Sequence, residues 1–273
     1  MKNGIVIPCY NESNRLPLDQ YDAFIKEDSN YILCFVNDGS NDDTLEVLQK
    51  FKNKRDRVYV YDMPCNKGKA EAVRHGIKHM LQETNVSNVG FLDADLSTDF
   101  NDYKRLVKSL NDSTDLQMTF GSRKMGNESQ IERKGFRSIA SMVAGLMIKF
   151  ILGLPIKDTQ CGAKVFSRNA ASYCFTQPFH TRWLFDVELF VRFKSFVNTG
   201  KVMSFMREIP LLKWMDVEGS KITINDSIQI PLQLLNIAYQ YNVKPSVKSN
   251  FQTIMYAIWS MISFQKVGAN VGQ

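Results

Sequence analysis

The sequence predicts an α/β fold with a mainly parallel central sheet and helices between its strands. Short apolar runs rich in β-branched and aromatic residues recur at intervals of roughly 25 to 30 residues, and amphipathic helical patterns separate them. Acidic and turn-forming residues directly follow several of these runs. Strands and helices that alternate at this spacing form βαβ units, which bind ligands at the carboxyl ends of the strands.

We expect five strands, one at each apolar run. These runs are Gly4–Cys9, Tyr31–Val36, Val58–Tyr61, Val89–Leu92 and Leu116–Phe120. An amphipathic helix should follow the second strand, because Ser40-x-x-Asp43 resembles a capping box at the start of such a helix. The stretch Lys69–Leu81 predicts another helix.

The pattern changes after Arg123. A polar segment at Met125–Arg133 predicts a loop, and the nearly apolar stretch Ile139–Leu154 follows it. Further helices are expected at Phe185–Val197, Ser227–Tyr241 and Phe251–Phe264. We therefore expect one catalytic-type α/β domain over residues 1–242 with C-terminal helices, followed by an amphipathic helical tail over residues 243–273.

The composition excludes several classes of protein. With 44% apolar and 23% charged residues in 273, the chain is neither disordered nor fibrous. Its five cysteines are odd in number and include no C-x-x-C pair, which argues against a disulfide framework or a cysteine zinc site. We expect neither a signal peptide nor a membrane span, because the start of the chain and its apolar stretches are too short for either. The formal net charge of +6 can serve nucleic acid, an anionic membrane or a phosphorylated substrate.

Polar segments end the first two predicted strands. The first strand runs into Pro8-Cys9-Tyr10-Asn11-Glu12, and the second into Asn37-Asp38-Gly39-Ser40. At such positions an aromatic ring can stack on a base, and a carboxylate can accept hydrogen bonds from a ribose. The alternative is ordinary turn chemistry, with Asp43 capping the next helix.

The fourth predicted strand ends in Asp93-Ala94-Asp95. Alternation along an extended chain would place the carboxylates of Asp93 and Asp95 on the same side. Two adjacent carboxylates favour a hard divalent cation, Mg²⁺ or Mn²⁺, which completes its shell with water and diphosphate oxygens.

These segments resemble the family 2 glycosyltransferases of the GT-A fold. The matching strings are P-x-Y-N-E from Pro8, V-N-D-G-S-x-D-x-T from Val36, N-K-G-K-A-E-A-V from Asn66, and D-A-D from Asp93. Three further strings are similar to the dolichyl-phosphate β-glucosyltransferase branch of this family, so that the resemblance covers about residues 4–242. They are D-T-Q-C-G-A-K-V-F from Asp158, R-W-L-F-D-V-E from Arg182 and V-E-G-S-K from Val217.

The resemblance implies an inverting transfer of a hexose from a nucleotide diphosphate sugar, UDP-glucose above all, to a polyprenyl phosphate. It assigns the base and ribose to Pro8, Tyr10, Glu12 and Asp38. It assigns the rest of the nucleotide sugar to Lys69, Asp93 and Ala94. Asp95, with Asp93 beside it, would ligate the metal, and Ser97 stands where the related mannose synthases often carry a further glutamine ligand.

A phosphate acceptor is expected at Arg123 and Arg137. The guanidinium group suits bidentate phosphate recognition, and both residues match arginines that the related mannose synthases use for the lipid phosphate. Ser141 would lie one helical turn after Arg137, on the same face. The alternative reading is that both arginines belong to a solvated basic loop.

Two aspartates are assigned to the reaction together with these arginines. Asp186 would contact the donor sugar or act as a base, and Asp158 would line the same pocket or cap its own turn. Because a phosphate monoester is already ionised near neutral pH, positioning and charge neutralisation should dominate catalysis. A family 2 enzyme that extends a glycan, with a hydroxyl acceptor and Asp186 as general base, is the nearest rival.

A peripheral membrane location follows from the lipid acceptor. Ile139–Leu154 and Phe251–Phe264, the latter with flanking lysines, suit interfacial helices, although core burial is an alternative for both. The expected site of action is the cytoplasmic, inner face of the membrane. No nucleic-acid partner is expected, because no basic stripe interleaved with aromatic residues occurs.

Overall fold

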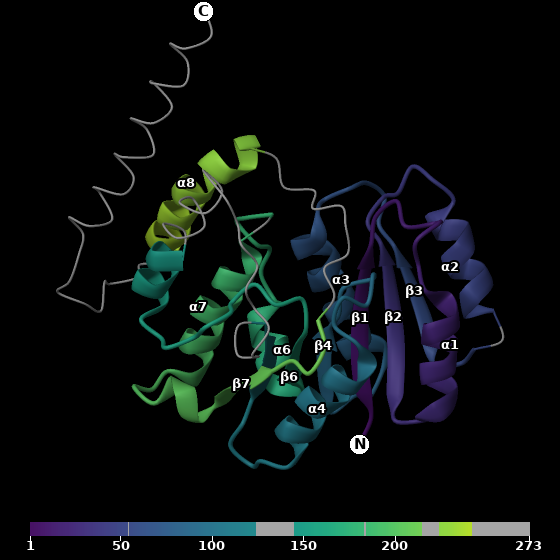
Figure 1. Cartoon of the computed structure of the whole chain (residues 1–273), viewed down its shortest axis with the longest axis horizontal. Coiled ribbons are helices and arrows are strands. Elements are labelled where there is room, and N and C mark those ends of the chain that lie inside the picture. Colours follow the sequence, from purple (N-terminus) through teal and green to yellow (C-terminus); the bar gives the residue numbers. More distant parts are fainter. Residues whose placement is uncertain (54, 124–144, 183, 215–223, 242–273) are drawn as a thin grey trace, which may run out of the picture. The chain divides into compact units, whose positions relative to one another are not determined.

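The computed structural model describes residues 1–53, 55–123, 145–182, 184–214 and 224–241. Its centre is a seven-stranded sheet in the order β3-β2-β1-β4-β6-β5-β7 (Figure 1). Every recorded strand pair is parallel except the two that β6 makes with β4 and β5. The predicted α/β fold with a mainly parallel sheet is confirmed.

All five predicted strands are present, and two strands were not predicted. The strands are β1 (Asn3–Cys9), β2 (Tyr31–Asn37), β3 (Val58–Asp62), β4 (Asn88–Phe91), β5 (Met118–Ser122), β6 (Lys164–Ser167) and β7 (Met206–Pro210). β6 escaped prediction because it is four residues long and begins with a lysine. β7 did so because it carries Arg207 and Glu208 and ends in a proline.

Helices connect the strands. They are α1 (Leu18–Glu27), α2 (Thr44–Lys52), α3 (Lys69–Glu83), α4 (Phe100–Asn111), α6 (Arg168–Cys174), α7 (Phe185–Val197), α8 (Ile224–Gln240) and the short 3-10 helix η1 (Val202–Ser204). The helix predicted after the second strand is α2, but the predicted capping box is wrong. Asp43 occupies the N-cap position without a side-chain capping bond, and Ser40 Oγ instead accepts a hydrogen bond from the backbone N–H of Asn11.

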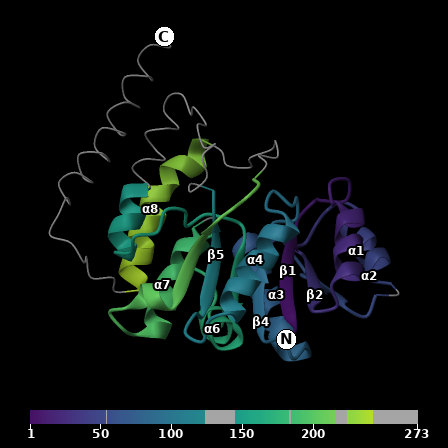
Figure 2. The same cartoon turned by 60° about the horizontal axis from the view of Figure 1, so that its bottom comes forward.

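The helices cover both faces of the sheet. Ile5 and Ile7 of β1 belong to one buried cluster with side chains of α1, α2 and α4. In Figures 1 and 2, α1 and α2 lie side by side at the β2 side of the sheet. α3 packs on the opposite face, where a Cβ at Gly76 would overlap Val6 and Val36. Each fully buried aliphatic or aromatic side chain in such a core contributes about 1.5–3 kcal/mol to folding.

The direction of β6 determines which residues meet at one edge of the sheet. Lys164, the first residue of β6, pairs with Phe91 at the end of β4 and with Phe120 near the end of β5. The segment before β6 therefore lies at the same edge as the segments that follow β1, β2, β4 and β5. Gly162 is thereby placed beside Asp93, although the two residues are far apart in sequence.

The chain divides into two compact units. The first contains Met1–Ser129 and Lys157–Glu218, and the second contains Gln130–Ile156 and Gly219–Gln273. In the second unit, residues 145–152 are helical and include the buried side chains of Met147 and Ile151. The predicted tail at 243–273 and the boundary before it lie outside the described residues. No helix in the described part of the chain has both the length and the apolar character needed to cross a bilayer.

Candidate active site

The loops after β1 and β2 are joined by hydrogen bonds between their turn residues. Asn11 has a left-handed backbone with φ +52°, which asparagine tolerates better than most residues. Its side-chain oxygen accepts a hydrogen bond from Asn41 N at 2.9 Å. Glu12 N donates to Thr44 Oγ1 at 2.8 Å. These bonds fix the P-x-Y-N-E segment against the start of α2.

The residues predicted to hold the base and ribose differ in exposure. Pro8, Tyr10 and Glu12 are half-buried, and Glu12 forms an ion pair with Arg15 at 2.7 Å. Asp38 is buried, and its two carboxylate oxygens accept the backbone N–H groups of residues 67 and 68, each at 2.8 Å. Burial raises the pKa of Asp38, while these hydrogen bonds act in the opposite direction. The carboxylate of Asp38 therefore anchors the N-K-G-K turn.

The N-K-G-K turn requires glycine at position 68 for two reasons. Gly68 has φ +91°, and a Cβ there would lie 2.8 Å from Arg182 Nε. Arg182 also donates a hydrogen bond to the side chain of Asn66 at 2.6 Å. The turn thus leads into Lys69 at the start of α3, and the guanidinium group of Arg182 lies beside the turn.

Lys69 forms an ion pair with Asp93. Burial lowers the pKa of Lys69, but the negative charges of Asp93, Asp186 and Asp95 outweigh this effect, so the pKa lies above its ordinary value. The ammonium group of Lys69 therefore stays charged and faces three carboxylates.

The D-A-D segment forms a turn, so the expected strand alternation does not describe it. β4 ends at Phe91, and Leu96 adopts a left-handed backbone with φ +54°. Such a conformation in a residue other than glycine costs free energy and is found mainly at functional sites. Asp95 accepts a hydrogen bond from Ser97 N at 2.9 Å, and the carbonyl of Ala94 accepts one from the hydroxyl group of Tyr21 at 3.2 Å.

The carboxylates of Asp93 and Asp95 fit a divalent cation in chemistry, although the protein supplies only part of a coordination shell. Both negative charges contribute to raising the pKa of Tyr21, which is elevated chiefly by burial, so both carboxylates lie near this ring. No group of three or more histidine, cysteine or acidic side chains suited to a metal occurs within the described ranges. A cation held here would take its remaining oxygen ligands from substrate and water.

The D-T-Q-C-G turn contacts this acidic segment directly. A Cβ at Gly162 would overlap the carboxylate of Asp93. Glycine is therefore needed at this position for the turn and the acidic segment to approach each other.

Lys164 and Asp186 form a buried ion pair at the same edge of the sheet. Lys164 Nζ donates to Asp186 Oδ1 at 2.5 Å and to the backbone carbonyl of Cys161 at 2.6 Å. The lysine side chain is 0% exposed. Asp186, predicted to contact the sugar or act as a base, is thus paired with a cation to which the sequence analysis gave no role.

Arg123 and Asp158, both predicted site residues, also pair with each other. Arg123 donates from Nε and Nη2 to the two carboxylate oxygens at 2.7 and 2.9 Å, and the carbon Cζ of its guanidinium group lies 5.6 Å from the centre of the Trp214 ring. Asp158 is 1% exposed, and Asp158 N donates to Glu208 at 2.8 Å. Burial lowers the pKa of the Arg123 guanidinium group. The hydrogen bonds and negative charge of Asp158 outweigh burial, so the pKa lies above its ordinary value. Arg137 and Ser141, the other predicted acceptor residues, lie outside the described residues.

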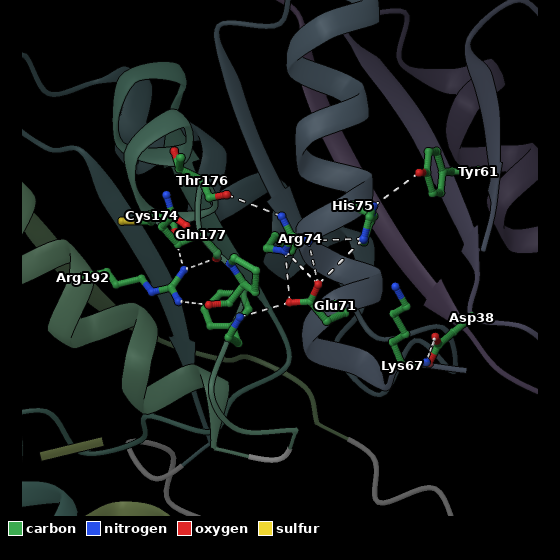
Figure 3. A network of polar contacts seen from close by, with 12 residues as sticks. Asp38, Tyr61, Lys67, Glu71, Arg74, His75, Cys174, Thr176, Gln177 and Arg192 are labelled. Atoms are coloured by element: carbon green, nitrogen blue, oxygen red, sulfur yellow. Dashed lines mark hydrogen bonds and ion pairs between the residues drawn. The ribbon is translucent and has the colours of Figure 1, made fainter. Parts of the chain in front are cut away.

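A network of charged residues holds the segment that leads to Arg182 (Figure 3). Glu71 of α3 pairs with Arg74 at 2.7 Å and accepts the backbone N–H of Phe179 at 3.1 Å. Arg192 of α7 donates to backbone carbonyls of residues 174, 177 and 178 at 2.6 to 2.9 Å. Glu188, which is fully buried, accepts the backbone N–H of Thr181 at 2.8 Å.

Comparison with known families identifies the chain. The family described as glycosyl transferase family 2 matches residues 4–175. The chain belongs to glycosyl transferase family 2. It is 33% identical over 258 residues to the dolichyl-phosphate beta-glucosyltransferase of Homo sapiens, which covers 87% of this chain and 75% of the relative. It is also 33% identical over 260 residues to the enzyme of the same name from Saccharomyces cerevisiae, with 87% and 74% covered.

Solved structures show the fold of this glycosyltransferase. Glucosyl-3-phosphoglycerate synthase from Mycobacterium tuberculosis superposes with a TM-score of 0.63 at 16% identity, covering 90% of this chain and 82% of that one. Mannosyl-3-phosphoglycerate synthase from Rubrobacter xylanophilus gives a TM-score of 0.65 at 14% identity, covering 92% and 78%. The predicted GT-A fold is confirmed.

Four charged residues that hold the segment before Arg182 have no role that the sequence pattern of this glycosyltransferase indicates. Glu71 and Arg74 are three apart on a helix, and Glu188 and Arg192 are four apart, which is the spacing of ordinary surface ion pairs. In the structure, all four side chains are at most 16% exposed. The available signal was that Glu188 and Arg192 are each flanked on both sides by apolar residues in α7.

Proposed function

We propose that this glycosyltransferase moves glucose from UDP-glucose to a polyprenyl phosphate, with inversion at the anomeric carbon. The observation that carries the proposal is the identity of 33% to two dolichyl-phosphate beta-glucosyltransferases over most of both chains. The arrangement of charges supports it. Lys69, Arg182 and Arg123 bring cations to the edge of the sheet where Asp93, Asp95 and Asp186 gather, as a diphosphate, a metal and a phosphate acceptor require.

In this proposal the donor lies across the ends of β1, β2 and β4. Pro8, Tyr10 and Glu12 contact the base and ribose. Asp38 lies near the ribose and anchors the N-K-G-K turn through its two hydrogen bonds. Lys69 and the segment from Asp93 to Ala94 line the rest of the nucleotide sugar. Lys69 neutralises charge on the donor while it stays paired with Asp93.

Asp95 and Asp93 are the residues that would hold Mg²⁺ or Mn²⁺. One solved glucosyl-3-phosphoglycerate synthase from Mycobacterium tuberculosis, with a TM-score of 0.61 at 17% identity, contains Mn²⁺ and uridine-diphosphate-glucose. When bound, the cation stabilises negative charge on the leaving diphosphate as a Lewis acid. The two carboxylates orient the cation, and Ser97 N fixes Asp95 through its hydrogen bond.

The acceptor phosphate is assigned to Arg123, Arg137 and Ser141. Two parallel hydrogen bonds to Asp158 orient the guanidinium group of Arg123. Only the remaining N–H groups of Arg123 can then donate to the acceptor phosphate. An ionised phosphate oxygen attacks the anomeric carbon without needing a strong general base. Asp186, which is paired with Lys164, then has the role of contacting the donor sugar.

Because its acceptor is a lipid, the enzyme should act as a peripheral protein on the cytoplasmic face of a membrane. In this arrangement residues 1–242 form the catalytic domain, and residues 243–273 form an amphipathic tail that lies at the membrane interface.

A transfer assay with radiolabelled UDP-hexoses, a short polyprenyl phosphate and either Mg²⁺ or Mn²⁺ tests this function. We expect label from UDP-glucose to enter the organic phase as a lipid-linked hexose, and the variant Asp95→Ala to abolish it. Label that stays water-soluble with every donor would refute the lipid acceptor. Incorporation into an added saccharide instead would show a hydroxyl acceptor.

A further inference from the structure

Lys164 is a buried cation whose presence needs an explanation. It begins β6 and is fully buried, although lysine is almost never fully buried unless it is paired. Replacing a buried ion pair by apolar side chains of similar size is often neutral or stabilising, so stability alone does not account for this pair. A role in the site itself is the alternative.

The hydrogen bonds of Lys164 join two segments of the site. One goes to the carboxylate of Asp186 on the first turn of α7, and the other to the carbonyl of Cys161 in the D-T-Q-C-G turn. The rings of Phe91 and Phe190 lie 5.4 and 5.9 Å from Nζ, which surrounds the ammonium group with aromatic faces. The ammonium position is therefore fixed on several sides.

Lys164 is also connected to the D-A-D segment from Asp93 to Asp95, which is proposed to bind the metal. Phe91, its partner in the sheet, lies two residues before Asp93, and the turn that Lys164 holds places Gly162 against the carboxylate of Asp93. A shift of the lysine would therefore change Asp186 and this turn together.

Two lysines form ion pairs with different carboxylates of the site. Lys69 from α3 pairs with Asp93 and also attracts Asp186 electrostatically, while Lys164 from β6 contacts Asp186 directly. Asp186 thus interacts with both lysines, and the carbonyl of Cys161 accepts a second hydrogen bond from Lys164. Without Lys164, the nearest cation to Asp186 would be Lys69, and the carboxylate could turn toward it.

We infer that Lys164 is a positioning residue for the transfer reaction, which holds the carboxylate of Asp186 in a fixed orientation toward the donor sugar. The inference rests on the proposed function, because the role of Asp186 toward the sugar does. Lys164 itself does not touch the reacting atoms, since it is fully buried behind Asp186.

A double-mutant cycle in the full-length protein tests this role. The variants are Lys164→Met, which keeps the length of the side chain without its charge, Asp186→Asn, and the combination of both. We expect each single variant to lower kcat about 100-fold with little change in KM for UDP-glucose, because an oriented charge acts mainly in the transition state. The double variant should be no slower than the slower single variant, because both changes remove one interaction.

The separation of kcat from KM gives a readout that a general loss of packing would not reproduce. Disordered packing around Lys164 would also weaken donor binding, whereas loss of an oriented charge lowers kcat with little change in KM for UDP-glucose. Lys69 remains in every variant and affects all of them equally.

Folding is monitored by urea denaturation of each variant. If Lys164→Met is unfolded because it leaves a buried carboxylate unpaired, the cycle is completed with Lys164→Gln, which can still donate a hydrogen bond. Arg168→Met is the control, because the half-buried Arg168 also donates to backbone carbonyls, those of residues 81, 84 and 86, at the other end of β6. The control should keep kcat within about threefold of wild type.

Three results would overturn the inference. They are a folded Lys164→Met variant with the kcat of wild type, losses that multiply in the double variant, and a rise in KM for UDP-glucose as large as the fall in kcat. Failure of the proposed function looks different, because wild type itself would then form no lipid-linked hexose. In that case the same cycle is measured on UDP-glucose hydrolysis, where coupled losses support the role of Lys164 and independent losses refute it.

Discussion

Arg123 donates two guanidinium hydrogen bonds and its own backbone N–H to the carboxylate of Asp158, although the two residues are 35 positions apart. The pair therefore fixes the end of β5 to the start of the D-T-Q-C-G turn. We expect Asp158→Asn to lower the free energy of unfolding by about 2 kcal/mol and activity by at least tenfold, because Arg123 loses its orientation. Urea denaturation and the lipid-transfer assay measure the two effects. The exposed Asp115→Asn serves as control, and equal behaviour of both variants would contradict the prediction.

Gly162 should tolerate no side chain. Because a Cβ at this position would overlap the carboxylate of Asp93, Gly162→Ala must displace either the turn or the acidic segment. We expect transfer activity to fall about 100-fold while the protein stays folded, since a displacement of about 1 Å in a site can cost that much. Gly200→Ala is the matched control, because nothing lies within 4 Å of a Cβ there. A Gly162→Ala enzyme as active as this control would show that the two segments need not touch.

Asp95→Asn should weaken metal binding more than folding. Asp95 is proposed as a ligand, and replacing a carboxylate by an amide removes one of the two acidic ligands available to a hard cation. We expect a higher Mn²⁺ concentration to be needed for half-maximal activity, and a weaker Mn²⁺ signal in calorimetry with UDP present. Asp56→Asn, on an exposed loop, should leave both measurements unchanged. Full activity of wild type in excess chelator would exclude a metal requirement altogether.

Arg182 should contribute to donor binding. Its guanidinium group lies beside Gly68 and Asn66 at the start of α3, where it adds positive charge to the helix N-terminus. We predict that Arg182→Ala raises KM for UDP-glucose about tenfold, as expected for loss of a charged hydrogen bond, with unchanged stability because the side chain is exposed. Arg207→Ala, an exposed arginine on β7, is the control. An unchanged KM in Arg182→Ala would place the diphosphate elsewhere.

Acid should destabilise the loop pair through Asp42. Burial is the largest single effect and raises the pKa of Asp42, but the hydrogen bonds from Thr44 and Ser13 together outweigh it and lower the pKa to about 2. A carboxyl group whose pKa is lower in the folded state stabilises the protein above its unfolded pKa of 3.8, and this contribution is lost as the pH falls toward 2. The melting temperature of wild type should therefore fall more steeply than that of Asp42→Asn across this range. Parallel curves would show that Asp42 does not contribute.

The amino-acid pattern predicts the half of the fold that is built from apolar strands. β1 and β2 are long buried runs, and α7 matches its predicted bounds, Phe185–Val197, because the uncharged polar residues Asn198 and Thr199 and then Gly200 end the apolar pattern there. β6 could not be predicted in the same way, since Lys164 at its start is buried only because Asp186 reaches it from α7. The antiparallel direction of β6 is a property of the assembled sheet.

The site residues that directly follow a strand could be predicted from the sequence. The contacts between segments that are distant in sequence could not. Asp93 and Lys69 were both expected at the nucleotide, and the structure pairs them. Asp38 was expected at the ribose, and its hydrogen bonds to the N-K-G-K turn are a contact that no local pattern indicates. Glu188 resembles a surface residue by its spacing from Arg192, and the apolar residues that flank it in α7 were the local sign that it is buried.

The position of β6 has a consequence for how the protein folds. β6 follows β5 in the chain but lies between β4 and β5, so β4 and β5 cannot become joined in one sheet until β6 has been synthesised and inserted. Contacts between segments so distant in sequence form late and slowly. On the ribosome, β1 to β4 can pair first, while the acidic segment after β4 still lacks the turn that packs on it. We therefore expect nascent chains that end before β6 to contain folded strands but to bind no nucleotide sugar.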